Sequence, residues 1–280
     1  MKLGISLRTM GPQSTAETLA ACARAAESAG LDEIFVPDHI AIPPDDAEGS
    51  GGRYLDPLAA LAWLAPQTAR IGLGTAVLIL PYRAALPTAK IVATIQELSG
   101  GRLTALGVGI GWMAAEFRAL GVPRARRAAD SDTALDFFAR AFGSDVVEAN
   151  GQPFLFLPRP RRPAILVGGA APHALARAAR FGDGWMPIGA KPADLAPQIA
   201  RLREAFDAAG KPAPEVAVMT RLPLEDSGRA GELARAYAEL GATRLIHSSR
   251  YADAGEFARS VEAIAGRIRP ALAGVRGEPP

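Results

Sequence analysis

The strongest constraint on the fold of this chain is a repeated alternation of short apolar runs with amphipathic stretches. The apolar runs have the length of buried strands, and the intervening stretches have the spacing and capping residues of helices. Strands that are apolar on both faces are typical of a parallel sheet covered by helices on each side. The strands that we expect are Lys2–Leu7, Glu33–Val36, Arg70–Leu80, Leu103–Val108, Ala164–Val167, Gly184–Pro187, Glu215–Thr220 and Arg244–His247.

The segments between these strands predict helices. Ser14 is expected to cap the first, with Glu17 completing a capping box, and the helix continues to about Ala29. Asp56 and Pro57 are typical of a second helix start, as N-cap and first helical residue. That helix is expected to reach about residue 68, and the others to occupy Pro87–Leu98, Ser131–Phe142, Pro172–Phe181, Asp194–Ala209, Arg229–Leu240 and Gly255–Arg269.

Eight strand–helix units within 280 residues favour a closed (β/α)8 TIM barrel, an α/β fold, over an open doubly wound sheet. An open sheet that binds a dinucleotide would need a G-x-G-x-x-G turn after its first strand, and Arg8–Pro12 has no such pattern. We therefore expect residues 1–280 to form one barrel domain. In a barrel, catalytic residues lie where the strands end, on the C-terminal face.

Composition and charge exclude several classes of protein. The 49% of hydrophobic and 21% of charged residues are typical of a folded chain rather than a disordered one. A net charge of +2, without basic residues gathered on one face, argues against nucleic-acid binding. The single cysteine, Cys22, excludes an intramolecular disulfide framework. No segment has the ~20 apolar residues of a membrane span, and no secretory signal is evident, so we expect a cytoplasmic protein without a membrane partner.

Three polar residues follow the predicted strands at positions suited to chemistry. Asp38 and His39 come directly after the second strand, and Glu116 begins a helix after the fourth. A histidine beside an aspartate is compatible with a structural pair or with proton transfer, and its place after a barrel strand favours proton transfer. Glu116 is compatible with an acid–base group or with a charge favoured by the helix dipole.

Small residues follow the fourth and fifth strands. The turn Gly168–Ala171 leads directly into a helix, so its amides and the helix N-terminus favour an anion such as a phosphate, although a tight turn alone would explain the glycines. Gly109 and Gly111 are consistent with a flat ligand over the barrel mouth. The remaining histidines, His173 and His247, do not form a metal-ligand pattern with other residues, so we expect no metal site.

Several motifs, taken in order along the chain, resemble the bacterial luciferase-like monooxygenase superfamily. They extend over most of the chain, to about residue 190, and the sequence is most similar to the branch that uses the deazaflavin coenzyme F420, whose close relatives bind FMN. The motifs are Tyr54–Pro57, Arg70–Val77, Leu98–Arg102, Gly107–Trp112, Glu116–Phe117, Gly168–Gly169 and Gly182–Trp185, together with Asp38–His39.

The resemblance implies a homodimeric barrel with a flavin or deazaflavin at its C-terminal mouth and a small-molecule substrate. It also implies a cis peptide bond between Ala76 and Val77, behind the ring of the cofactor. The residues that it assigns to the cofactor are Thr75, Ala76, Val77, Gly109, Gly111 and Trp112, with Gly168, Gly169, Ala170 and Ala171 around the phosphate.

For catalysis the resemblance implies proton transfer by His39, and we expect Asp38 either to orient its imidazole or to bind the polar edge of the cofactor ring. F420-dependent dehydrogenases of the family have a carboxylate where this chain has Trp112, and Glu116 is the nearest acid. We expect an F420-dependent oxidoreductase. The alternatives are an FMN-dependent monooxygenase and a barrel that binds cofactor without turnover. The Gly-rich loop of residues 41–53 is expected to form a lid over the mouth.

Overall fold

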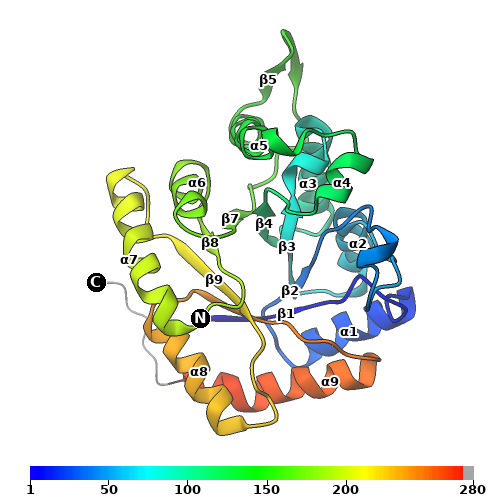
Figure 1. Cartoon of the computed structure of the whole chain (residues 1–280), viewed down its shortest axis with the longest axis vertical. Coiled ribbons are helices and arrows are strands. Elements are labelled where there is room, and N and C mark those ends of the chain that lie inside the picture. The colour runs from blue at the N-terminus through cyan, green and yellow to red at the C-terminus, as the bar shows by residue number, and fades with distance from the viewer. Residues whose placement is uncertain (274–280) are drawn as a thin grey trace.

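Eight parallel strands close into a barrel in the computed structural model, which describes residues 1–273 (Figure 1). Around the barrel the strands follow one another in the order β1, β10, β9, β8, β7, β4, β3, β2. The predicted (β/α)8 fold is therefore confirmed. The strands are β1 (Lys2–Ser6), β2 (Glu33–Val36), β3 (Gly72–Ile79), β4 (Leu103–Gly109), β7 (Ala164–Gly168), β8 (Gly184–Met186), β9 (Glu215–Thr220) and β10 (Arg244–His247).

Helices surround the barrel and cover the outward faces of its strands (Figure 1). They are α1 (Ala16–Ser28), α2 (Pro57–Leu64), α3 (Ala85–Leu98), α4 (Ala114–Ala119), α5 (Arg127–Gly143), α6 (His173–Phe181), α7 (Pro192–Ala208), α8 (Ser227–Glu239), α9 (Ala254–Ala263) and α10 (Arg269–Leu272). Across residues 1–273, no helix combines the length and the apolar character needed to cross a membrane.

The strands are buried on both faces because alternate side chains enter two different cores. On β2, Ile34 and Val36 belong to the large core between the barrel and its helices, whereas Phe35 points into the barrel. The barrel interior is filled by the side chains of Phe35, Ala76, Ala105, Leu166, Met186, Ala217, Met219 and Ile246. This division explains the continuous apolar runs in the sequence.

The structure corrects some local predictions. The N-cap of α1 is Thr15, whose hydroxyl accepts a hydrogen bond from the Thr18 amide, rather than Ser14. The Ser14 hydroxyl is occupied elsewhere, because it donates to the Gly11 carbonyl and accepts from Arg53.

Two parts of the chain depart from the predicted helices and strands. An antiparallel hairpin, β5 (Val146–Ala149) and β6 (Gln152–Leu155), follows α5 and projects from the barrel (Figure 1). Its Asn150-Gly151 turn has positive φ at both residues, the conformation that favours this dipeptide in hairpins. The helix predicted over 255–269 is interrupted by a π-helical segment, Ile264–Ile268, between α9 and α10.

Glycine at position 107 is required by the close approach of β3 and β4. A Cβ atom there would lie 2.2 Å from the Thr75 carbonyl oxygen and 2.8 Å from the Met186 sulfur. The Thr75 hydroxyl also donates to the Gly107 carbonyl over 2.7 Å, which ties the two strands together below the mouth.

We predict that Gly107→Ala lowers the free energy of unfolding by about 1–3 kcal/mol, because the added methyl group forces backbone to move in a packed core. Urea unfolding followed by circular dichroism measures this change. The control is Gly143→Ala at the end of α5, where a Cβ atom has no neighbour within 4 Å. Equal stability of the two variants would contradict the prediction.

Candidate active site

Three loops at the C-terminal ends of β2, β3 and β4 meet around one carboxylate, that of Glu116. His39 follows β2, Tyr82 ends a 3-10 turn (Leu80–Tyr82) after β3, and Glu116 lies in the first turn of α4 after β4. The Glu116 side chain is fully buried, and the His39 side chain is 17% exposed. The site therefore places a hidden acid behind an accessible imidazole.

Four donors satisfy the Glu116 carboxylate. One oxygen, Oε1, accepts from the amides of Ile40 at 2.6 Å and Ala41 at 2.9 Å. The other, Oε2, lies 2.8 Å from His39 Nδ1 and accepts from the Tyr82 hydroxyl over 2.8 Å. A buried carboxylate is stable only when its lone pairs are used in this way.

These contacts determine the protonation of the site. Burial alone would raise the pKa of Glu116, but the hydrogen bonds from Ala41, Ile40, His39 and Tyr82 outweigh it and hold the pKa below its usual value. Burial and the hydrogen bond to Glu116 raise the pKa of Tyr82, which stays protonated. An ionised carboxylate only accepts, so His39 Nδ1 carries a hydrogen. Nε2 has no hydrogen-bond partner among residues 1–273.

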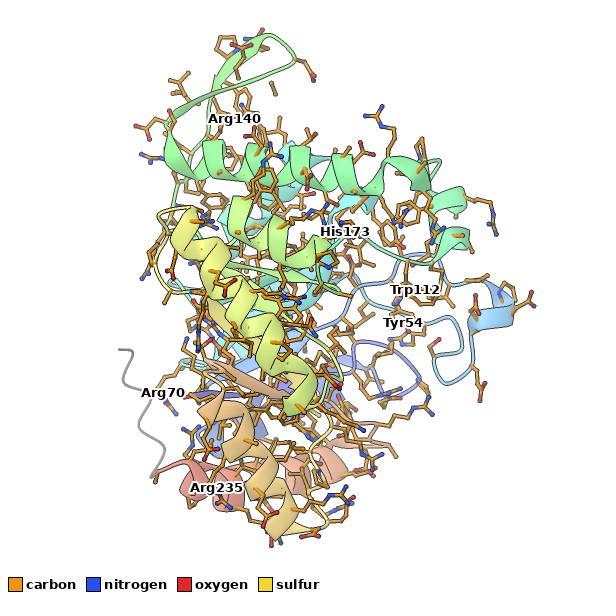
Figure 2. The ribbon with its side chains drawn as sticks, turned by 60° about the vertical axis from the view of Figure 1, so that its left-hand side comes forward. Tyr54, Arg70, Trp112, Arg140, His173 and Arg235 are labelled. Carbon is orange, nitrogen blue, oxygen red and sulfur yellow. The ribbon has the colours of Figure 1, made fainter. Side chains whose placement is uncertain are left out.

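Two aromatic rings flank the imidazole of His39. Tyr54 contacts it edge-on with ring centroids 5.0 Å apart, and Trp112 does the same at 6.1 Å. Trp112 is 64% exposed, and Figure 2 places Tyr54 and Trp112 close together at this end of the barrel. The predicted residues Trp112, His39 and Glu116 are thus brought into one cluster.

Asp38 lies outside this cluster, although it precedes His39 in the sequence. Its carboxylate forms a two-point ion pair with Arg83, at 2.6 Å and 2.9 Å, and accepts from the Ile79 amide. Arg83 also contacts Asp56, the N-cap of α2, over 2.8 Å. Burial would lower the pKa of Arg83, but the two carboxylates raise it, so the guanidinium stays charged. The carboxylate that contacts the imidazole is that of Glu116, and Asp38 fastens the neighbouring loops.

The floor of the mouth is formed by Val77 and by glycines. The Ala76–Val77 peptide bond is cis, as the resemblance implied. Val77 is half-buried, while the other residues of β3 are buried. Cβ atoms at Gly109 and Gly168 would lie 2.7 Å and 2.9 Å from the methyl groups of Val77, so only glycine fits beside it. Thr75 and Ala76 are buried beneath this floor.

The turn after β7 lies at the same end of the barrel. Gly169 and Ala170 are exposed, Gly169 has a φ of +114°, and α6 begins at His173. The Gly169 carbonyl accepts from the indole of Trp185, which anchors the turn. Within the described residues the amides of Ala170 and Ala171 have no hydrogen-bond partner. They remain available to an anionic ligand.

The other histidines have different environments. His173 is exposed at the start of α6, whereas His247 is 2% exposed at the end of β10. His247 Nδ1 accepts from the Leu222 amide over 3.1 Å, and Nε2 lies 3.0 Å from the Ser249 hydroxyl. Burial, and next the charge of Arg221, lower the pKa of His247 to about 4. No group of three metal-ligating side chains occurs within residues 1–273.

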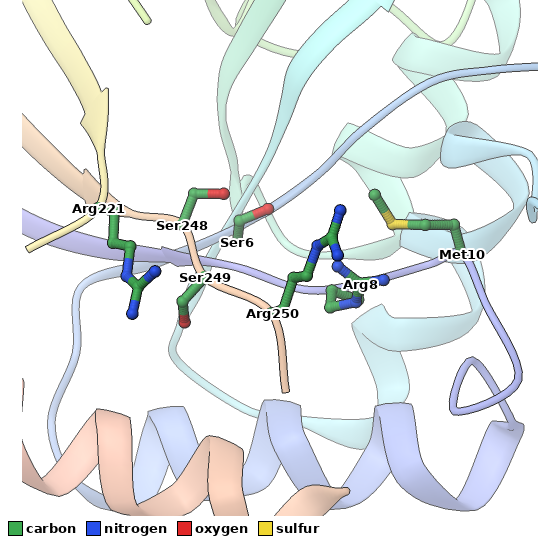
Figure 3. A pocket seen from close by; sticks show the side chains of 7 residues that line it. All are labelled: Ser6, Arg8, Met10, Arg221, Ser248, Ser249 and Arg250. Carbon is green, nitrogen blue, oxygen red and sulfur yellow. The ribbon is translucent and has the colours of Figure 1, made fainter. Parts of the chain in front are cut away.

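A cavity of about 340 Å³ opens at the ends of β1, β9 and β10 (Figure 3). It is lined by Ser6, Arg8, Met10, Arg221, Ser248, Ser249 and Arg250. Sequence reasoning did not assign this cavity, nor the contacts of Tyr82 and Arg83. Their position shortly after strand ends was the available signal, because that is where barrel loops converge.

The protein is a (β/α)8 barrel, and the cluster around Glu116 places ionisable groups at the carboxyl ends of its strands. Barrel enzymes have their active sites at this face. A family model described as luciferase-like monooxygenase matches residues 1–276. The chain belongs to this family.

Two relatives illustrate its range. An uncharacterized protein of Mycobacterium tuberculosis is 31% identical over 272 residues, 90% of this chain and 94% of that protein. An F420-dependent glucose-6-phosphate dehydrogenase of Kineococcus radiotolerans is 30% identical over 265 residues, 89% of this chain and 76% of that protein.

Solved structures share the fold at lower identity. An F420-dependent secondary alcohol dehydrogenase, in complex with an F420–acetone adduct, superposes with a TM-score of 0.80 at 16% identity, over 97% of this chain and 98% of that one. The oxygenating constituent of 3,6-diketocamphane monooxygenase from Pseudomonas putida, in complex with FMN, has a TM-score of 0.77 at 15% identity, over 96% and 98%. These likenesses show the barrel architecture alone.

Replacing Glu116 by Gln is predicted to lower the free energy of unfolding at pH 7 by about 3 kcal/mol, because the amide nitrogen of Gln cannot accept the hydrogen bonds that one carboxylate oxygen accepts. The folded pKa of Glu116 lies below its unfolded value, so its stabilisation is complete above about pH 4.5 and is lost as the pH falls through the folded pKa. Urea unfolding at pH 7 and at pH 3.5 measures both effects. Exposed Glu97→Gln is the control, and an E116Q variant as stable as wild type would refute the prediction.

The lowered pKa of His247 predicts a second loss of stability in acid, at a higher pH than the loss due to Glu116. Its folded pKa of about 4 lies below the unfolded value of 6.5, so stability is full above pH 6.5 and falls as His247 of the unfolded chain binds a proton. Between pH 7 and pH 5 we expect wild type to lose about 2 kcal/mol through this group. His247→Gln should flatten that slope, and the exposed His173→Gln should not. Identical slopes in all three proteins would exclude the effect.

Proposed function

We propose that this chain is an oxidoreductase that transfers a hydride between coenzyme F420 and a small organic substrate at the C-terminal mouth of the barrel. The observation that carries the proposal is the buried Glu116 carboxylate, which fixes the imidazole of His39 beside a glycine-lined opening. A relative named as an F420-dependent dehydrogenase supports the cofactor class.

The mouth fits a flat tricyclic ring with a phosphate-bearing tail. Val77 and the backbone of Gly109 and Gly168 offer a surface without large side chains. The amides of the turn 169–171 and the N-terminus of α6 would hold the phosphate, because both favour negative charge. Trp112 is exposed enough to contact a ring or a substrate. When bound, the coenzyme would supply hydride chemistry that no amino-acid side chain offers.

The side chains around the mouth would handle the accompanying proton. His39 Nδ1 is committed to Glu116, which leaves Nε2 as the ring nitrogen that can accept or donate a proton at the substrate. Glu116 would stabilise the charged imidazole, and Tyr82 keeps Glu116 in place. Asp38 holds the loops through Arg83 and would act on position rather than on the proton.

A second candidate function is an FMN-dependent monooxygenase. The observation that favours it is Trp112. This exposed indole stands where the F420-dependent dehydrogenases that the chain resembles have a carboxylate. A structural neighbour that contains FMN supports this cofactor as the alternative.

A homodimer and a cytoplasmic location are further proposals. Light scattering tests the first of them.

Titration of the protein with F420 and with FMN, followed by fluorescence, tests the cofactor. We predict micromolar binding of F420 and weaker binding of FMN. Ala170→Asp should weaken F420 binding about tenfold or more, because a negative charge enters the phosphate turn. Ala176→Asp, at another exposed alanine on α6, is the matched control. Binding of neither cofactor would overturn the proposal, and preference for FMN would transfer it to the second candidate.

His39→Ala tests the proton-transfer role. The variant should bind cofactor as wild type does and should turn over about a hundredfold more slowly with any alcohol that reduces F420, because the proton acceptor is lost. Rates are measured from the absorbance of F420 under anaerobic conditions. Turnover at the wild-type rate would remove His39 from the mechanism.

A further inference from the structure

Three arginines line the cavity at the ends of β1, β9 and β10. Arg8 follows β1, Arg221 directly follows β9, and Arg250 follows β10 (Figure 3). The hydroxyls of Ser6, Ser248 and Ser249 complete the polar lining, and none of the lining residues is acidic. The cavity therefore offers hydrogen-bond donors and positive charge together.

The positive charges of these arginines are not neutralised by close ion pairs in the described part of the chain. None of the three forms an ion pair there, in contrast to Arg83 beside Asp38 and Arg177 beside Asp132. Arg8 Nε is buried and has no hydrogen-bond partner in residues 1–273. Like charges gathered in one cavity repel, and a buried unpaired donor is unfavourable, unless an anion binds between them.

Two of the guanidiniums meet the Gly-rich loop of residues 41–53. Arg8 Nη2 donates to the Gly49 carbonyl over 3.4 Å, a weak hydrogen bond, and Arg250 Nη2 lies 3.8 Å from a Cβ atom placed on Gly49. The loop therefore contacts two of the arginines that line the cavity. Gly49 has a φ of +75°, a backbone conformation that favours glycine, so the turn itself explains the residue at this position.

The cavity lies apart from the turn proposed for the cofactor phosphate. In the closed order of strands, β1 and β7 are four neighbours apart in either direction. Arg250 follows β10, three neighbours from β7, and Arg221 follows β9, two neighbours from it, so the cavity and the Gly168–Ala171 turn are separate sites on the rim of the barrel. His39 belongs to the loop after β2, the strand beside β1.

We propose that this cavity binds an anionic group of the substrate, a carboxylate or a phosphate monoester, and so directs the reacting carbon toward His39. This inference rests on the proposed function, since it names the class of substrate for the same mouth. Guanidinium groups bind both anions through paired hydrogen bonds, so the chemistry is shared. His247 assists by holding Ser249 and the Leu222 amide next to Arg221.

The experiment compares Arg221→Gln/Arg250→Gln with the control Arg201→Gln/Arg229→Gln, which removes the same charge at exposed positions outside the cavity. Thermal unfolding is recorded with increasing inorganic phosphate or succinate, with sodium chloride at matched ionic strength. We expect at least one anion to stabilise wild type and the control, with apparent affinity about tenfold or more weaker in the R221Q/R250Q variant. The anion that stabilises more strongly identifies the preferred group.

Titration of the same variants with F420 shows whether the cavity binds the substrate or the cofactor. Unchanged F420 affinity in R221Q/R250Q supports a substrate site, whereas a loss of tenfold or more assigns the arginines to the cofactor and overturns the inference. Absence of anion stabilisation in wild type, or its persistence in R221Q/R250Q, also overturns it. Failure of wild type to bind either cofactor would reject the proposed function, while specific loss of anion stabilisation would still support the anion site.

Discussion

The burial of one carboxylate, that of Glu116, is the interaction on which the arrangement of the mouth depends. A charge with no exposure to solvent must receive all its hydrogen bonds from protein, and here they come from the loops after β2 and β3. Those bonds fix the path of residues 39–41, the position of Tyr82 and the start of α4. The orientation of His39 is thus a consequence of satisfying a buried acid.

A second ionic cluster, formed by Asp38, Arg83 and Asp56, joins the same loops. Arg83 joins Asp38, after β2, to Asp56, at the start of α2, while Asp38 also accepts from the Ile79 amide at the end of β3. The two networks divide the work. Asp38 and Arg83 stabilise the backbone of the rim, and Glu116 holds the His39 imidazole at the opening, where we propose that it transfers a proton.

The two sides of the mouth differ in chemistry. The side near β7 offers glycines and free amides, which suit a cofactor held by its backbone contacts, and the side near β1 offers arginines and serines. The small net charge of +2 means that anions must be attracted by such local groups. This division underlies the proposed separation of cofactor and substrate.

Much of the barrel could be predicted because local patterns agree with the final packing. The strands β2, β9 and β10 have the predicted bounds, since each is a buried apolar run that ends at a polar or turn residue. The cap of α1 was misplaced because Ser14 and Thr15 are both good caps, and the choice depends on Arg53 from a distant loop. The Asn150-Gly151 dipeptide is by itself a hairpin signal, because both residues readily adopt positive φ.

The candidate site was only partly predictable, for a related reason. Sequence position brought His39, Glu116 and Trp112 to the strand ends, but it did not reveal which acid contacts the imidazole. Asp38 is adjacent in the chain, yet it is drawn to Arg83, and Glu116 reaches His39 across 77 positions. The arginine cavity depends in the same way on loops after β1, β9 and β10 that only the closed barrel brings together.

Nitrogen NMR of the His39 side chain, compared between wild type and Glu116→Gln, tests most directly that Glu116 fixes the imidazole. If Glu116 holds the ring, Nδ1 of wild type carries a hydrogen at neutral pH and shows a coupling or shift typical of a strong hydrogen bond. Any proton on Nε2 exchanges rapidly with solvent. The variant should lose that signature at Nδ1. A neutral His39 with its hydrogen on Nε2 in wild type, or identical spectra for the two proteins, would contradict this role of Glu116.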